Sequence, residues 1–371
     1  MPRNTGILVA LAVLASAGQA QAQEVAVALH GFGSWSYGNT NSNVYLAGRP
    51  EGDYRRTDFA LNLAAAVGDK LKIHSEVVWR EGDDGSAAGL DYAFAEYALS
   101  DNVSLRLGQI KQPFGIYTEV FAVGTLRPFI DLPQSLYGPV GFVGQAYKGI
   151  GLSGSAGSGS WSLAYDVYGG GQNLAKFFIP EAYYHGDPIV AGVGEIELLS
   201  TRNVFGGRLV AHTPVSGLSF GGSAYSGTLD EAAANRRTVV AGQLEYRSNK
   251  FTLESEVAYL NQVGDEHSTA YYAQAAYRIT PRWQVAGQYD YLKNVFDGID
   301  PSAAPSLQFH KEGAVAINYW FSRSLVLKAE FHRVSGNRFA LPDPENLAAE
   351  ITAGTLSTTT NLVQFGAQFS F

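Results

Sequence analysis

The stretch that decides the fold is Lys111–Gly144, KQPFGIYTEVFAVGTLRPFIDLPQSLYGPVGFVG. It lies between two segments with the alternation of strands, Val103–Ile110 and Tyr147–Ser155. A connection this long is usually either functional or disordered. Its six aromatic residues and low charge argue against disorder, and its four prolines argue against a sheet strand. We therefore predict an ordered, apolar loop that packs against the inside of a barrel.

The first residues have the pattern of a secretory signal peptide. Arg3 precedes an apolar run, Ile7–Ala17, and Ala20-Gln21-Ala22 supplies a cleavage site of small residues. The run is shorter than the roughly 20 residues that a membrane-spanning helix needs. We expect residues 1–22 to be a signal peptide cleaved after Ala22, with Ala20 as the alternative. The formal net charge of −8 would then become −9, because Arg3 is the one charged residue removed.

Composition favours a large all-β domain at 23–371. The chain has no cysteine, which excludes a disulfide framework, and its 42 glycines, 21 tyrosines and 20 phenylalanines suit many short strands and turns. Negative charge is spread along the chain, which excludes the basic face of a nucleic-acid-binding protein. No linker or shift in composition divides the sequence, so we expect one closed sheet.

From Glu24 onward, segments of roughly ten residues alternate apolar with polar or small residues, the two-residue period of a strand. Seven short turns and eight longer loops separate these segments, the longer ones expected around 39–55, 81–89, 111–144, 170–201, 228–236, 262–266, 295–309 and 335–359. This predicts about sixteen antiparallel strands with both termini on the short-turn side. An even strand number with short turns at one end and long loops at the other is typical of bacterial outer-membrane barrels.

The last segment, Asn361–Phe371, carries the clearest alternation. Val363, Phe365, Ala367, Phe369 and Phe371 share one face, while glutamine, glycine and serine occupy the other. We interpret Phe369 and Phe371 as an assembly signal. Aromatic residues near other strand ends suit the girdles at the membrane interfaces; they are Trp35, Tyr37, Trp79, Tyr97, Trp161, Trp283, Trp320 and Phe321.

Two short motifs carry a resemblance to a known family. The run RLGQIKQPFGIY (Arg106–Tyr117), followed by LRPF and PQSLY, is similar to the porin superfamily that includes the phosphate-selective porins, and the terminal strand resembles the assembly signal of Gram-negative outer-membrane proteins. The resemblance implies a sixteen-stranded homotrimeric channel whose third loop folds inward and narrows the pore. It also implies the outer membrane, its lipopolysaccharide and its barrel assembly machinery as partners. The sequence departs from the phosphate-selective pattern, because its fifth loop offers Arg236 and Arg237 rather than lysines.

The function expected from these features is passive diffusion of small hydrophilic solutes, without cofactor, metal or catalytic residues. We expect the constriction to be formed by Arg106, Lys111, Glu119, Arg127 and Asp131. Alternation places further polar residues on the pore wall: His74, Glu76, Asp166, Arg208, Glu254, Glu256, Asp290, Lys328 and Glu330. Among the inward-facing charged residues expected near the middle of the barrel wall, acids outnumber bases. Rings of charged side chains set the ion preference of a pore. The count predicts a weak cation preference, with an anion- or phosphate-selective pore as the alternative.

Several residues and motifs match patterns found in proteins of other classes. Gly149–Gly154 matches G-x-G-x-x-G and Gly217–Gly221 matches G-x-S-x-G, but both lie in strand patterns rather than at strand-to-helix turns. The loop acids Asp83, Asp84, Asp297 and Asp300 lack the spacing of a known metal site. A barrel enzyme, which could use lumen histidines such as His30, His74 and His212, and a surface receptor or adhesin, which would use the long outer loops, remain open as alternatives from other classes.

Overall fold

The computed structural model describes residues 25–371 apart from 83–84, 141, 178–195, 230–235, 265, 298–304, 343–345, 347–349 and 351–352. The predicted signal peptide, Asp83, Asp84 and Asp300 lie outside the described residues. The described chain forms one sheet of sixteen long strands and one two-residue strand. The strands are β1 (Val25–Thr40), β2 (Gly48–Arg49), β3 (Asp53–Val67), β4 (Leu71–Gly82), β5 (Gly85–Ser100), β6 (Val103–Lys111), β7 (Ala146–Ser158), β8 (Trp161–Phe177), β9 (Ile196–His212), β10 (Leu218–Leu229), β11 (Arg236–Arg247), β12 (Phe251–Gln262), β13 (Glu266–Arg278), β14 (Trp283–Phe296), β15 (Phe309–Ser322), β16 (Leu325–Ser335) and β17 (Thr359–Ser370).

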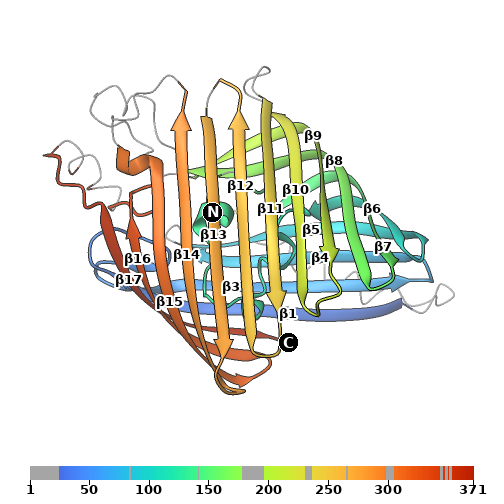
Figure 1. The fold of residues 1–371 in the computed structure, drawn as a ribbon, viewed down its shortest axis with the longest axis horizontal. Coiled ribbons are helices and arrows are strands. Elements are labelled where there is room, and N and C mark those ends of the chain that lie inside the picture. The colour runs from blue at the N-terminus through green and yellow to red at the C-terminus, as the bar shows by residue number, and fades with distance from the viewer. Residues whose placement is uncertain are drawn as a thin grey trace, which may run out of the picture.

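The sheet closes on itself through β1. This strand pairs antiparallel with β3 on one side and with β17 on the other, with Gly33 opposite both Phe59 and Phe369. Each other long strand pairs with its neighbours in the chain, so no edge is left among the described strands. Figure 1 shows β11–β14 crossing in front of β1, β3 and β4 at a steep angle, as tilted strands on opposite walls of a barrel do. The predicted antiparallel barrel of sixteen strands is confirmed.

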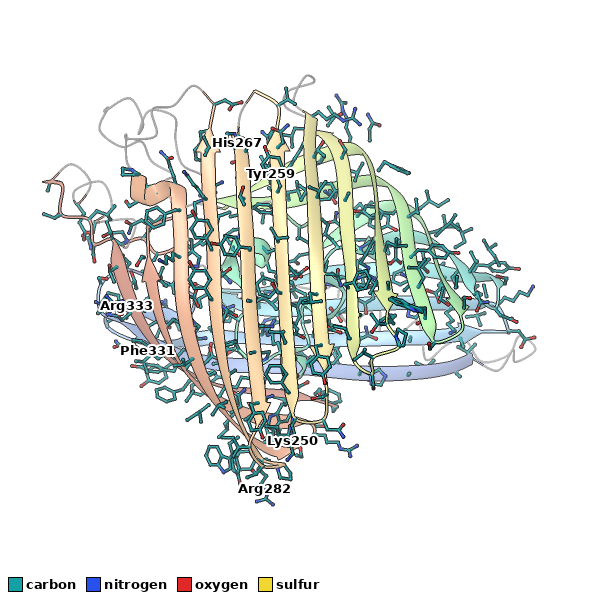
Figure 2. The ribbon with its side chains drawn as sticks, viewed as in Figure 1. Lys250, Tyr259, His267, Arg282, Phe331 and Arg333 are labelled. Carbon is teal, nitrogen blue, oxygen red and sulfur yellow. The ribbon has the colours of Figure 1, made fainter. Side chains whose placement is uncertain are left out.

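The two faces of the wall differ in polarity, as the alternation predicts. On β3, Leu61 points outward and is exposed while Ala60 is buried, and on β17 Phe365 is exposed while Gln364 is buried. Large apolar side chains therefore cover the outside (Figure 2). Lys250 and Arg282 lie at the end with the short turns, here called the short-turn rim. An apolar outer belt of this kind is the surface that a barrel presents to lipid.

Two predicted connections differ from the structure. β4 and β5 approach each other to Gly82 and Gly85, where a long loop over 81–89 was expected, so this hairpin is short. β8 and β9 remain paired out to Phe177 and Ile196, so the expected loop 170–201 is strand at both of its ends. Alternation fades in the glycine-rich part of β8, which removes the signal that marks a strand. The end of the barrel opposite the short-turn rim is here called the long-loop rim.

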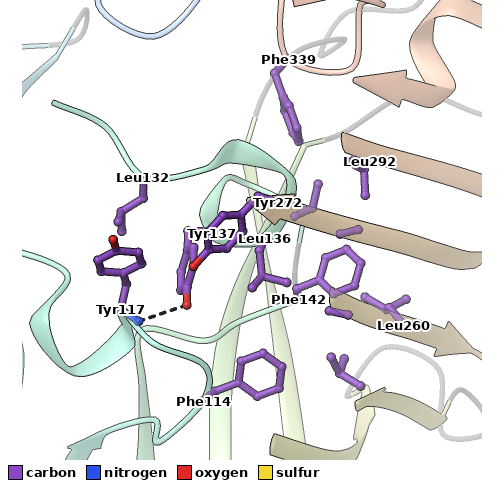
Figure 3. Packing of buried hydrophobic residues seen from close by; sticks show 14 of the residues in the cluster. Phe114, Tyr117, Leu132, Leu136, Tyr137, Phe142, Leu260, Tyr272, Leu292 and Phe339 are labelled. Carbon is purple, nitrogen blue, oxygen red and sulfur yellow. Dashed lines mark hydrogen bonds between the residues drawn. The ribbon is translucent and has the colours of Figure 1, made fainter. Parts of the chain in front are cut away.

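The segment between β6 and β7 enters the barrel. It contains three short helical turns, η1 (Thr118–Val120), η2 (Gly124–Leu126) and α2 (Gln134–Tyr137). Figure 3 shows its aromatic side chains packed with Tyr272, Leu292 and Leu260 of the wall. Phe114 and Phe142 are fully buried. Among the residues that the structure describes, no helix is long and apolar enough to span a bilayer.

Candidate functional site

The inward segment, residues 112–145, is here called the inner loop, and its first anchors are carboxylates of β12. The backbone N–H of Ile116 donates to Oε1 of Glu256 at 3.1 Å, and the hydroxyl of Tyr137 donates to Oε2 of the same residue. The hydroxyl of Tyr117 donates to Glu254. Burial raises the pKa of both loop tyrosines well above the ordinary value, and the neighbouring carboxylates raise it further. These phenols therefore stay protonated and can act as donors.

Further anchors come from β14 and β16. The N–H of Ser135 donates to Asp290 at 3.0 Å, and the N–H of Ile130 donates to Glu330 at 2.6 Å. The ammonium of Lys328 donates to the carbonyl oxygens of Gly124, Arg127 and Phe129 at 3.0, 2.7 and 3.0 Å. Buried polar groups must be paired because leaving them unsatisfied costs about 1–3 kcal/mol each. The charged side chains of the wall and the backbone groups of the loop therefore serve as each other's hydrogen-bond partners.

The inner loop also reaches the seam where the barrel closes. Asp131 accepts from the amide of Gln364 on β17 at 2.9 Å and pairs with the guanidinium of Arg56 on β3 at 2.6 Å. Burial by itself would raise the pKa of Asp131, but Arg56, Gln364 and Arg127 outweigh it and hold the pKa below the ordinary value. Together with the contact of Gly115 to Ser223 on β10, these anchors fix the loop to the wall from β10 round to β3.

A second cluster of charges lies beside the start of the inner loop. Arg208 of β9 donates to Asp166 at 3.0 Å and to Glu119 of the loop at 2.5 Å. Arg106 of β6 pairs with Glu96 at 2.8 Å and lies 3.8–3.9 Å from the carboxylates of Asp166 and Glu119. Two guanidinium groups and three carboxylates thus pair within the cluster, and the pairs with Glu119 pin the loop to the wall.

Three predicted site residues lie near β5. Lys111 is buried and pairs with Asp91, with its ammonium 5.8 Å from the ring centroid of Tyr92. Glu76 is buried, and the amide of Asn62 donates to it at 3.5 Å. His74 stacks on Phe94 at 4.9 Å between ring centroids. His30 and His212 are exposed.

A cavity of about 1460 Å³ occupies the part of the lumen that the inner loop leaves open. Its walls come from β1 and from β3 to β9, with one side formed by the inner loop. The bases that line it are Arg49, Arg55, Arg56, Arg80, Arg127, Lys148 and Arg202, and the acids are Asp53, Asp58, Glu81, Asp91 and Asp131. Among the described residues, bases therefore outnumber acids on this surface, and Asp91 is already paired with Lys111.

The structure changes the role of several residues picked from the sequence. Of the five residues predicted at the constriction, Arg127 and Asp131 are among the residues that line the described cavity. Glu254, Glu256, Asp290 and Glu330 are on the lumen side of the wall, but they are buried beneath the inner loop. The count that predicted a weak cation preference treated these four carboxylates as charges facing the passage, and it was wrong to do so because the inner loop covers them.

Other lining residues were missed. Arg56 and Asp58 share the inward face of β3 with Ala60, and Arg80 continues the inward face of β4 beyond Glu76 and Val78. The alternation in the sequence carried this signal, but these residues fell within or beside stretches expected to be loops. Extending the strands predicted at Phe59–Val67 and Leu71–Trp79 by one to three residues would have brought them inside the barrel.

A closed barrel with an apolar belt, an inward loop and a cavity in its lumen defines an outer-membrane channel. Residues 54–371 match the model of the family described as phosphate-selective porin O and P, and the chain belongs to that family. The family and the similar barrels described as porins or channels are not enzymes. A comparison with curated proteins finds no matching sequence.

Solved structures with the same fold are distant in sequence. The outer membrane channel DcaP of Acinetobacter baumannii is 14% identical with a TM-score of 0.60, covering 94% of this chain and 97% of that chain. The anion-selective porin from Comamonas acidovorans is 13% identical with a TM-score of 0.56, covering 94% and 100%. The trimer form of OmpT from Vibrio cholerae is 10% identical with a TM-score of 0.54, covering 94% and 99%. Identities this low show a shared fold.

Proposed function

We propose that this porin conducts small hydrophilic solutes passively and prefers anions. The observation that carries the proposal is the separation of charge across the lumen. Carboxylates of β12, β14 and β16 are covered by the inner loop, while arginines of β3 and β4 line the cavity. Charged side chains in a narrow, low-dielectric passage set ion preference because solvent screens them weakly.

Arg80 is the arginine best placed to act on passing ions. Its side chain is 46% exposed. The guanidinium groups of Arg80 and Arg56 each lie 3.9 Å from the carboxylate of Asp58. Arg56 also neutralises Asp131. The positive charges of Arg56 and Arg80 are therefore matched by the two carboxylates of Asp58 and Asp131. Arg127 and Lys148 add further positive charge to the lining.

The arginine-rich lining favours phosphate or carboxylate groups among anions. Of the bases that line the described cavity, Lys148 is the one lysine. Guanidinium groups bind both anions through paired, planar hydrogen bonds. Anion passage is also supported by the family, which is described as phosphate-selective, and by the Comamonas acidovorans porin, which is described as anion-selective. Selectivity for phosphate alone is the narrower alternative.

Reversal potentials in a KCl gradient across a planar bilayer test the preference. We expect chloride to be the more permeant ion and Arg80→Gln to reduce the permeability ratio by about half or more. Lys250→Gln, at the exposed short-turn rim, is the matched control and should leave the ratio unchanged. Cation preference in the wild type would overturn the proposal, and a block of chloride current by phosphate but not by acetate would favour the phosphate-specific alternative.

We also propose how the chain reaches and occupies the membrane. Residues 1–22 act as a signal peptide, residues 23–371 form the barrel with 111–144 as its constriction loop, and Phe369 and Phe371 are read by the barrel assembly machinery. A homotrimer is supported by the trimer form of the Vibrio cholerae neighbour. Chemical cross-linking in native outer membranes should give a trimer band; a monomer alone would contradict this part of the proposal.

Lipopolysaccharide is the proposed lipid partner at the long-loop rim. Lys293, Lys311 and Arg333 are exposed on β14, β15 and β16, and the register places Lys311 opposite Tyr291 and Gly313 opposite Arg333. Figure 2 shows Arg333 on the outside, above Phe331 on the same strand. Basic groups just above an apolar belt suit the phosphates of lipopolysaccharide. Replacing all three by glutamine should weaken its retention during purification, and unchanged retention would contradict this.

A further inference from the structure

Three buried side chains near the long-loop rim form a cluster outside the lining of the described cavity. Asp290 lies on β14, and His310 and Glu312 lie two residues apart on β15. The register sets Asp290 directly opposite Glu312. One ligand atom from each of the three lies within 4.8 Å of those of the other two. We propose that Asp290, His310 and Glu312 bind a divalent transition-metal ion.

The separations between the polar atoms fit metal ligands better than hydrogen-bond partners. Nε2 of His310 lies 3.5 Å from Oδ2 of Asp290 and 3.3 Å from Oε2 of Glu312. Hydrogen bonds between charged groups are typically about 2.7–2.9 Å long. In a tetrahedral zinc site with bonds of about 2.0–2.2 Å, neighbouring ligand atoms lie roughly 3.3–3.6 Å apart. The two separations from Nε2 of His310 match edges of such a site.

The cluster also holds polar atoms with no partner. Within the described part of the chain, neither ring nitrogen of His310 makes a hydrogen bond, nor does Oδ1 of Asp290. His310 and Asp290 are completely buried, and Glu312 is 2% exposed. Buried polar groups are normally hydrogen-bonded, so an imidazole that lies between two carboxylates without a hydrogen bond to either points to a missing ligand.

Neighbouring groups orient the two carboxylates. The N–H of Ser135 donates to Oδ2 of Asp290 at 3.0 Å, and the hydroxyl of Tyr45 donates to Oε2 of Glu312. Oε1 of Glu312 lies 2.6 Å from Nδ1 of His332. Partners of this kind hold metal ligands in place and tune their affinity. Because Tyr45 and Ser135 belong to two different loops, a bound ion would join both loops to the wall.

Charge and donor type define the class of ion. Two carboxylates carry two negative charges, and burying them requires compensation that a divalent cation supplies. One imidazole nitrogen with two carboxylate oxygens suits zinc and its first-row neighbours better than calcium or magnesium, which prefer oxygen ligands alone. Zinc is therefore the probe of choice, and three protein ligands leave one position open.

Metal content of the full chain, folded in detergent with zinc and then dialysed, tests the proposal. We expect one zinc per chain by elemental mass spectrometry, and visible d–d absorption when cobalt replaces zinc. His310→Gln and Asp290→Asn should each lower zinc affinity by more than about 100-fold, and Tyr45→Phe by about 10-fold or more, because it removes only an orienting hydrogen bond. The matched control is His212→Gln, since His212 is exposed and distant in sequence from the cluster.

If a variant fails to fold, the zinc content and cobalt absorption of the wild-type barrel still test the proposal. A wild-type barrel with normal heat-modifiable mobility, no stoichiometric zinc and no cobalt absorption would overturn the proposal. Zinc bound equally by folded His310→Gln would also overturn it, because the ion would then lie elsewhere. Stoichiometric binding that is lost in His310→Gln and kept in His212→Gln would establish the site.

Discussion

The guanidinium of Arg56 and the carboxylate of Asp131 lie 2.6 Å apart, joining β3 to a loop that leaves the wall at β6. The loop reaches β3 after contacts with β10, β12 and β16, and Ser135 then contacts β14. It therefore follows more than half of the circumference of the barrel. The passage is confined to the remaining side, where β3 to β9 supply most of its lining.

The first prediction concerns the pH dependence of this ion pair. The folded-state pKa of Asp131 is lower than its ordinary value of about 3.9. Its stabilising contribution is therefore fully present above the unfolded pKa and is lost as pH falls through the folded pKa. Asp131→Asn should lower the free energy of unfolding by about 1 kcal/mol at pH 7, a modest value because the Arg56 side chain is 36% exposed.

Urea unfolding of wild type and Asp131→Asn between pH 7 and pH 2 measures this effect. The difference between the two proteins should be constant from pH 7 to about pH 5 and shrink toward zero below about pH 4. A difference that grows as the solution becomes more acidic would show that the carboxylate does not stabilise the fold in its charged form.

The second prediction concerns Lys328. Lys328→Met leaves three loop carbonyl oxygens without their donor. At about 1 kcal/mol or more for each buried orphan, the free energy of unfolding should fall by about 3 kcal/mol. Heat-modifiable gel mobility and urea unfolding in detergent measure the change. Lys250→Met, at an exposed turn, should alter stability by less than about 0.5 kcal/mol; equal effects of the two variants would mean that Lys328 does not anchor the loop.

The third prediction concerns the width of the passage. Deleting 121–132 removes the part of the inner loop that contains Arg127, Asp131 and the anchors to β16. Single-channel conductance should rise several-fold, because a barrel of sixteen strands without a plug leaves an open aqueous lumen. If conductance stays at the wild-type value, the loop does not form the constriction.

The fourth prediction separates assembly from stability at the C-terminus. The rings of Phe371 and Phe369 cover Gly31 and Gly33 of β1, where an added Cβ would lie 2.1 and 2.3 Å from the ring atoms. Phe371→Ala should lower the amount of assembled barrel in cells several-fold, while the purified variant refolded in detergent keeps normal heat-modifiable mobility. Loss of folding in detergent as well would make Phe371 a packing residue of the closing seam rather than an assembly signal.

The alternating pattern by itself determined the barrel. Because side chains on a strand point to opposite faces in turn, residues such as Leu61 and Asn62, or Phe365 and Gln364, assign the lipid and lumen sides without any knowledge of tertiary contacts. Strand number followed from the turns, and the aromatic, proline-rich stretch at 111–144 predicted an ordered loop inside. Strand ends were predicted less accurately, since alternation weakens in glycine-rich segments such as the end of β8.

Only the tertiary structure decided what the lumen charges do. Alternation places Glu256, Asp290 and Arg80 on the same inner surface, yet the first two are covered by the inner loop and the third lines the cavity. A loop that crosses the lumen can rest on either side of it, and the choice depends on long-range pairs such as Ile130 with Glu330 and Asp131 with Arg56. Contacts between residues so far apart in the chain leave no periodic signal, so the sign of the lining charge and the cluster at His310 emerged only from the fold.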